Sequence, residues 1–146
     1  MKWFEKLVSG RRPDLIVEIE GKVYMKRWWV IPRNRFLNIF LHKFVHSDEP
    51  VLHDHPWPSI SYYLKGRLAE TFPDGGRLCQ QGKFYYRSAS QLHYLTKVDQ
   101  QSVWTLFFTG PKLREWGFRT DKGWIPHFLF TNRPGANEQR EYKRAS

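Results

Sequence analysis

Two histidines, His53 and His55, are separated by a single residue. In an extended segment, side chains two residues apart lie on the same face, so both imidazoles can bind one ion. A third imidazole, His93, lies in a strand-like stretch at residues 91–97. Three neutral imidazoles suit Fe, Zn, Cu or Ni and leave coordination positions for water, dioxygen or substrate. The spacing therefore indicates a metal site, with ordinary polar histidines as the alternative.

The histidines are predicted to lie on or beside strands. Residues 36–45 alternate along their length, and His42 shares a face with Phe40 and Phe44, which makes it a core histidine or a neighbour of the site. Two hairpins are predicted at Gly21-Lys22 and Lys65-Gly66. The predicted strands are residues 15–20, 23–30, 36–45, 59–64, 67–72, 83–87, 91–97, 102–109, 114–120 and 124–130, with a turn at residues 73–76 and a helix at residues 1–8. Short strands at this spacing predict an all-β sandwich or barrel.

Length and composition favour one folded domain. The chain has 146 residues, of which 40% are hydrophobic and 17% aromatic, enough apolar surface for one core. We assign residues 1–132 to the domain and residues 133–146 to a polar tail. Cys79 is the only cysteine, so no intramolecular disulfide is possible and a reducing, cytoplasmic location is expected. No apolar run approaches the roughly 20 residues that span a bilayer, so no membrane partner is expected.

The net charge of +10 favours anionic partners through long-range attraction. A small molecule with a carboxylate or phosphate is the favoured partner, and nucleic acid is possible but less favoured. A solvated basic surface without a partner is the plain alternative. Exposed edge strands make a homodimer possible.

The histidines fall within a pattern that resembles the two motifs of the cupin superfamily. The motif positions of this sequence are Ser47, His53, His55, Ser59 and Gly66, followed by Gly82, Ser88, Ser90, His93 and Lys97. The three histidines and two glycines match, whereas Ser59 replaces the glutamate ligand of the family. The resemblance implies a cupin-like β-barrel, also called a double-stranded β-helix or jelly roll. Without that glutamate, the set is similar to the three-histidine cupins, among them the thiol dioxygenases, which use ferrous iron and dioxygen.

The metal that this resemblance implies is one divalent transition metal, with Fe(II) favoured and Zn, Ni, Cu or Mn as alternatives. A carboxylate ligand could return from the next strand. If Lys65-Gly66 forms a two-residue turn, Ser61 lies opposite Glu70, and Ser61 has the parity of His53. Glu70 is therefore a candidate ligand or catalytic base, against a solvent-facing or structurally paired carboxylate.

Three other residues are candidates for contacts with substrate. Tyr63 is a catalytic candidate because its hydroxyl could move a proton to or from substrate or oxygen. Arg87 precedes the second motif's turn and is predicted to bind a substrate carboxylate or phosphate. Trp57 is predicted to form a wall of the pocket. Ordinary packing is the alternative for each.

The leading hypothesis is a metal-dependent enzyme, an iron oxygenase of the dioxygenase type, acting on a small anionic substrate. One alternative is a non-redox isomerase or epimerase in which the metal polarises a carbonyl. The other is a non-catalytic cupin that binds a small ligand or nucleic acid. Oxygen uptake separates the first two, and salt-dependent nucleic-acid binding that survives His53→Ala identifies the third.

Overall fold

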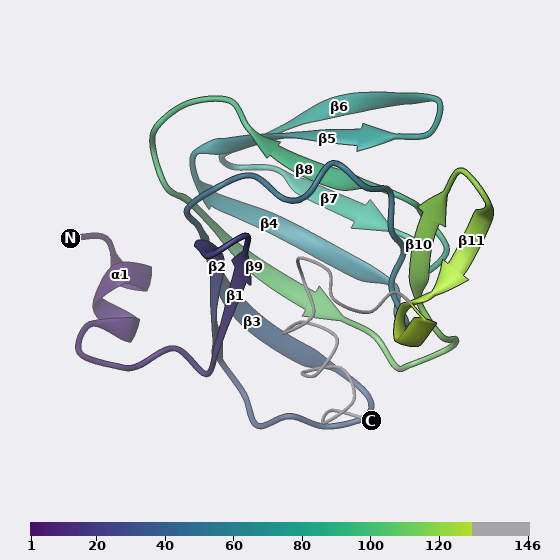
Figure 1. The fold of residues 1–146 in the computed structure, drawn as a ribbon. Helices are drawn as coiled ribbons and strands as arrows, with labels where there is room; N and C mark the ends of the chain where they lie inside the picture. The colour runs from purple at the N-terminus through teal and green to yellow at the C-terminus, as the bar shows by residue number, and fades with distance from the viewer. Residues whose placement is uncertain (130–146) are drawn as a thin grey trace.

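A computed structural model describes residues 1–129 of the chain (Figure 1). These residues form one short helix, eleven strands and a terminal turn of 3-10 helix. In chain order they are α1 (Trp3–Val8), β1 (Leu15–Ile19), β2 (Lys22–Trp29), β3 (Asn38–Phe44), β4 (Ser59–Lys65), β5 (Arg67–Phe72), β6 (Gly75–Gln80), β7 (Phe84–Arg87), β8 (Tyr94–Lys97), β9 (Val103–Thr109), β10 (Gly117–Thr120), β11 (Gly123–Pro126) and η1 (His127–Leu129). The predicted tail at residues 133–146 lies outside the described residues.

Two main sheets build the fold. One has six antiparallel strands in the order β1-β2-β3-β9-β4-β7, and the other has three in the order β6-β5-β8. The hairpin β10-β11 lies at the opposite end of the molecule from α1 (Figure 1). Single-residue bridges join His53 to His93, just before β8, and to Phe118 in β10. His53 therefore connects the three-stranded sheet to the hairpin.

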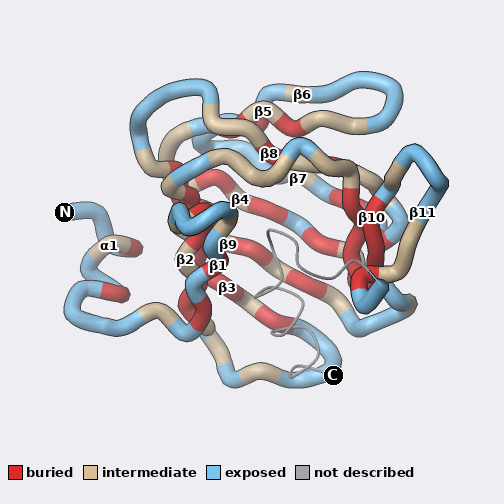
Figure 2. Tube along the Cα trace, in the orientation of Figure 1, coloured by how far each residue is buried: buried red, intermediate tan, exposed pale blue. Residues whose placement is uncertain are grey.

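The alternation of side chains explains how the sheets bury their inner faces. In β3, Phe40 and Phe44 lie in the interior together with His42. The other face of β3 is also covered, because Leu41 packs in a cluster with Phe4 of α1 and with Trp28, Trp104 and Val8. Figure 2 shows buried stretches along β3, β4 and β9. A central strand covered on both faces is predominantly apolar, as the sequence of β3 is.

The hairpin predicted at Lys65-Gly66 is wrong. β4 pairs with β7 and β9, whereas β5 pairs with β6 and β8, so the chain passes from one sheet to the other at this point. Gly66 has a φ of 80° there, which glycine adopts without the steric penalty of a Cβ atom. A glycine with positive φ is compatible both with a hairpin and with this crossover, so the sequence alone does not distinguish them.

The remaining sequence predictions agree with the structure except at a few boundaries. The hairpin between β1 and β2 is confirmed, but its turn lies at Glu20-Gly21 rather than Gly21-Lys22, because Lys22 pairs with Ile19 and begins β2. The turn expected at residues 73–76 is shorter, because Gly75 and Gly76 pair with Phe72 and Thr71 and begin β6. The strand expected at residues 124–130 ends at Pro126 within the described residues. No helix in residues 1–129 has the length and apolar character to cross a membrane.

Candidate metal centre

The backbone brings the three histidines together. His53 and His93 exchange two backbone hydrogen bonds, of 3.1 and 2.9 Å, across their isolated bridge. His55 follows two residues later, and its N–H donates to the carbonyl of Ala89. One ligand atom from each of the three imidazoles lies within 4.8 Å of the other two, and all three side chains are buried. The convergence predicted from the spacing is therefore confirmed.

The outer nitrogens of two imidazoles are fixed by hydrogen bonds. His53 Nδ1 lies 3.1 Å from the carbonyl oxygen of Val51, and His93 Nδ1 lies 2.6 Å from Oε2 of Glu70. Because both partners accept, both Nδ1 atoms carry the proton and donate. The Nε2 atoms of His53 and His93 are then left with free lone pairs, the arrangement that orients imidazoles toward a metal.

The donor set fits a divalent transition metal. His55 Nε2 lies 2.9 Å from His93 Nε2. Two nitrogens bound to one ion at about 2.0–2.1 Å come to lie about 3 Å apart, so this spacing suits two ligands of one metal. Burial holds the pKa of His55 well below its usual value and lowers that of His93 to about 3, against the opposing effect of Glu70. Both imidazoles are therefore neutral, the form that binds metal ions.

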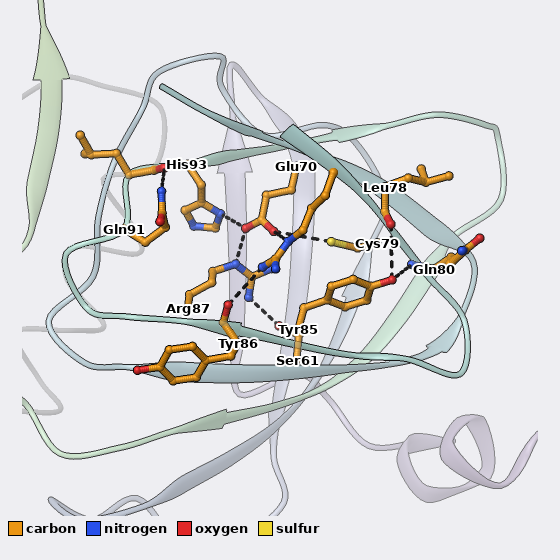
Figure 3. Close-up of polar contacts among 12 residues, drawn as sticks. Ser61, Glu70, Leu78, Cys79, Gln80, Tyr85, Tyr86, Arg87, Gln91 and His93 are labelled. Carbon is orange, nitrogen blue, oxygen red and sulfur yellow. Dashed lines mark hydrogen bonds and ion pairs between the residues drawn. The ribbon is translucent and has the colours of Figure 1, made fainter. Parts of the chain in front are cut away.

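Glu70 contacts the side chain of His93 (Figure 3) and is not one of the residues whose ligand atoms converge. Its Oε2 accepts from His93 and from Arg87 Nε, and its Oε1 accepts from Arg77 Nε at 2.7 Å and lies 3.5 Å from Cys79 Sγ. Burial alone raises the pKa of Glu70, but the hydrogen bond from His93 and the charge of Arg87 outweigh it and lower the pKa. An ionised Glu70 thus orients a neutral His93.

Arg87 and Tyr63 both line a cavity that the three imidazoles share. Arg87 is buried, and besides its bond to Glu70 it donates through Nη1 to the hydroxyl of Ser61 at 2.9 Å. Tyr63 is 1% exposed. Burial, reinforced by Cys79 and Glu70, raises the pKa of Tyr63 well above its usual value, so its hydroxyl keeps its proton.

Trp57 packs directly against the site. Its ring stacks on His55 with centroids 5.0 Å apart and planes inclined by 7°. Trp57 also lines a larger surface cavity of about 810 Å³, together with Trp116 and Phe128. Trp57 thus contacts both His55 and this second cavity.

Two further residues of the shared cavity are not indicated by the sequence. Asp48 lines the shared cavity, and its Oδ2 lies 3.7 Å from His53 Nε2. Arg27 is buried and donates through Nε to His42 Nε2 at 2.9 Å. Asp48 lies in a loop without periodicity. Arg27 has the same strand parity as the buried Met25, but this parity alone was too weak to predict that the arginine points inward.

No protein-family model matches the sequence, and neither does any curated protein. Solved structures do resemble it. A double-stranded β-helix protein from Klebsiella pneumoniae is 12% identical, with a TM-score of 0.56 over 72% of this chain and 90% of that one. The Fe(II) form of HppE is 15% identical, with a TM-score of 0.56 over 68% of this chain and 57% of HppE. A cupin_2 domain of an XRE-family transcriptional regulator from Enterobacter cloacae is 9% identical, with a TM-score of 0.52 over 62% and 99%.

These similarities define the fold. The chain is a double-stranded β-helix protein with a cluster of three histidines inside it. It has the cupin fold, as the two histidine motifs implied. At these identities the likeness establishes the fold alone, and the similar structures include both a regulator domain and an Fe(II) protein.

Proposed function

We propose that this protein is a metal-dependent enzyme that holds Fe(II) on His53, His55 and His93 and oxygenates a small anionic substrate. The observation that carries the proposal is the convergence of three buried imidazoles on a shared cavity. Three protein ligands leave coordination positions open for substrate and co-substrate, which distinguishes a catalytic from a structural site. Ferrous iron held there would supply redox chemistry with dioxygen.

The surrounding side chains have separate tasks in this proposal. Glu70 orients His93 and balances the charge of Arg87. Tyr63 keeps its proton and provides a hydroxyl that donates to substrate in the cavity. Trp57 covers His55 and excludes water from that side. The net charge of +10 attracts an anionic substrate from a distance.

The first experiment is elemental analysis of protein purified without chelator and without a nickel column. Wild type is expected to bind about one equivalent of transition metal, and a His53→Ala/His93→Ala double variant to bind almost none. His46→Ala is the matched control, because His46 is exposed and lies outside the cluster. Equal metal content in wild type and double variant would remove the basis of the proposal.

The second experiment measures oxygen consumption by the Fe(II)-loaded protein with a panel of small carboxylates and phosphates. Substrate-dependent oxygen uptake that disappears in His93→Ala is expected. Metal-dependent turnover without oxygen uptake would contradict the oxygenase and support the non-redox isomerase or epimerase instead. Salt-dependent nucleic-acid binding, unaffected by His53→Ala and without any turnover, would support the binding module.

A further inference from the structure

Four polar side chains form a row across the inner face of the six-stranded sheet. Arg27 in β2 pairs with His42 in β3, His42 pairs with Thr105 in β9, and Thr105 pairs with Tyr63 in β4. All four are at most 3% exposed, and all four line the cavity that holds His53, His55 and His93. The interior of a small barrel is normally apolar at such positions, so the row needs an explanation.

Arg27 carries a buried charge that no carboxylate balances. Among the described residues its guanidinium makes one hydrogen bond, to His42, and no ion pair, and its Nη1 has no hydrogen-bond partner. The ring of Phe40, 4.5 Å from Cζ of Arg27, stabilises the charge only in part. Arg87 in the same cavity differs, because Glu70 neutralises it. An unmatched buried charge is costly to the folded state.

The two neighbours of Arg27 present further unsatisfied groups. A guanidinium nitrogen can only donate, so His42 Nε2 accepts from Arg27 and the proton of the neutral imidazole lies on Nδ1. His42 Nδ1 and Thr105 Oγ1 are both buried without a hydrogen-bond partner among the described residues. Three adjacent residues thus each hold an unused donor: a charged N–H, an imidazole N–H and a hydroxyl. Together these donors match the needs of an oxyanion.

We infer that Arg27, with His42 and Thr105 beside it, binds the carboxylate group of a small ligand. The inference deepens the proposed function and rests on it, because a carboxylate held here would lie in the cavity that the three imidazoles line. The cavity has a volume of about 40 Å³. At roughly 10–15 Å³ for each enclosed water, this is space for about three non-hydrogen atoms, the number in a carboxylate group.

The carboxylates near the cavity do not neutralise Arg27. Asp48 also lines the cavity, but its carboxylate lies beside His53 and forms no ion pair with Arg27. Glu70 is bound to His93, Arg87 and Arg77. Arg27 is therefore the cation of the lining that an incoming carboxylate can neutralise.

The test measures binding of acetate to protein stripped of metal by a chelator, by calorimetry and by the acetate-dependent shift of the thermal midpoint at constant ionic strength. Acetate is expected to bind wild type, while acetamide and inorganic phosphate bind much more weakly. Arg27→Gln is expected to weaken acetate binding by about tenfold or more, which is about 1.4 kcal/mol. Arg119→Gln is the matched control, since Arg119 is exposed on β10, and it should bind acetate like wild type.

Two further variants keep the test decisive. Thr105→Val is nearly isosteric and should reduce acetate affinity severalfold even if Arg27→Gln does not fold. Arg27→Met removes the unmatched charge, so its thermal midpoint without acetate is expected to equal or exceed that of wild type. Acetate affinity unchanged in the Arg27 or Thr105 variants, no acetate binding by wild type, or tighter binding of phosphate than of acetate would each overturn the inference.

Metal content separates this inference from the proposed function. Arg27→Gln is expected to keep its metal and lose acetate binding. His53→Ala is expected to lose its metal and, in the chelated state, keep acetate binding. If the Arg27 variants lose acetate binding but wild type binds no metal, the carboxylate site is supported and the metal enzyme is refuted. If wild type binds metal but the Arg27 variants bind acetate as wild type does, the metal centre is supported and the carboxylate site is refuted.

Discussion

At the residue scale, the charge on Glu70 is the feature on which the candidate metal centre most depends. The carboxylate is fully buried and contacts His93, Arg87 and Arg77. It holds the tautomer of His93 that leaves Nε2 free, and it balances the buried charge of Arg87. A single side chain therefore supports both the geometry of the site and the stability of the fold.

Glu70→Gln is expected to lower both the stability of the fold and the affinity of the candidate metal centre. The amide has nearly the same shape but no charge, so Arg87 is left buried without a counter-ion, which costs about 3–5 kcal/mol of the free energy of unfolding. Metal affinity is expected to fall about 10–100-fold, because the amide orients His93 less strongly. Urea unfolding of the apoprotein and competition with a chelating dye measure the two effects.

Arg77→Gln is the control for Glu70→Gln. Arg77 binds the same carboxylate, but its side chain is 32% exposed, so we expect its loss to cost at most about 1 kcal/mol. Arg87→Met should cost nearly as much as Glu70→Gln, and the combined variant should cost less than the sum of the two. Additive losses would show that the buried pair is not the source of the effect.

The sequence predicts the convergence of the three histidines and places Tyr63 and Arg87 near them, but it does not indicate Arg27 or Asp48. His53, His55 and His93 are accessible to prediction because two lie on one face of a strand and the third falls on a recognisable motif. Arg27 has no such indication, since an arginine in a strand is usually exposed, and its partner His42 lies on a different strand. Asp48 approaches His53 from an irregular loop, where no side-chain periodicity indicates which way a residue points.

At the element scale, two glycines of the histidine motifs have different tasks. Gly66 and Gly82 both have positive φ values, 80° and 86°. A Cβ on Gly66 would lie 3.0 Å from Cγ2 of Val103 and 3.2 Å from the carbonyl of Ser102, whereas a Cβ on Gly82 would meet nothing within 4 Å. Gly66 is thus restricted by its backbone conformation and by the approach of β9, where the chain crosses between sheets.

Gly66→Ala should therefore destabilise the fold more than Gly82→Ala. The left-handed conformation costs about 1–2 kcal/mol in each variant, and the contacts with β9 add to that cost only at Gly66. Urea unfolding of both variants provides the comparison, each serving as the control for the other. Equal losses would mean that β9 moves away without cost and that the close approach at Gly66 is unimportant.

The hairpin β10-β11 is attached to the histidine segment through Asp54. Asp54 Oδ1 accepts from the N–H of Gly117 at 2.7 Å, and its Oδ2 accepts from Trp124 Nε1 at 2.9 Å and pairs with Arg114 at 2.7 Å. The side chain is 2% exposed. Asp54 thus orients the neighbouring hairpin through these contacts.

Asp54→Ala is expected to release this hairpin. Loss of two hydrogen bonds to a charged acceptor, together with the ion pair to Arg114, should reduce the free energy of unfolding by about 3 kcal/mol, and amide exchange in β10 should accelerate. Hydrogen exchange followed residue by residue measures the effect. Asp121→Ala, at the exposed turn of the same hairpin, is the control and should leave exchange unchanged. Unchanged protection of β10 in Asp54→Ala would show that other contacts hold the hairpin.

Strand positions were predictable from side-chain periodicity, but strand partners were not. The alternation in β3 was evident in the sequence because one face of this strand lies in the barrel interior. The partners of β5 were missed because Gly66 permits a hairpin and a crossover equally. The first residues of β6 were missed because Gly75 and Gly76 resemble a turn, although a Cβ on Gly76 would lie 2.6 Å from the carbonyl of Glu70 across the pair.

At the scale of the whole molecule, the histidine cluster lies where separate parts of the fold meet. His53 bridges the strand region of His93 to the hairpin at Phe118. His55 and His93 come from segments 38 residues apart along the chain. A metal held by all three would therefore act as a cross-link between distant segments in the folded state. The unfolded chain has no such preformed site, so metal binding adds to the free energy of unfolding.

Zn(II), a redox-inert probe, should accordingly raise the thermal midpoint of the apoprotein. A free ion at 1,000 times its dissociation constant adds about 4 kcal/mol, and for a chain of this size that corresponds to roughly 10 °C. His93→Ala should show almost none of this increase, whereas the exposed-histidine control His46→Ala should show all of it. A chelator should return the wild type to its original midpoint. Zinc also binds histidines of the unfolded chain, which lowers the increase in thermal midpoint equally in both variants. An equal increase in His93→Ala and His46→Ala would therefore show that the ion binds outside the cluster and that the three histidines do not provide the stabilisation.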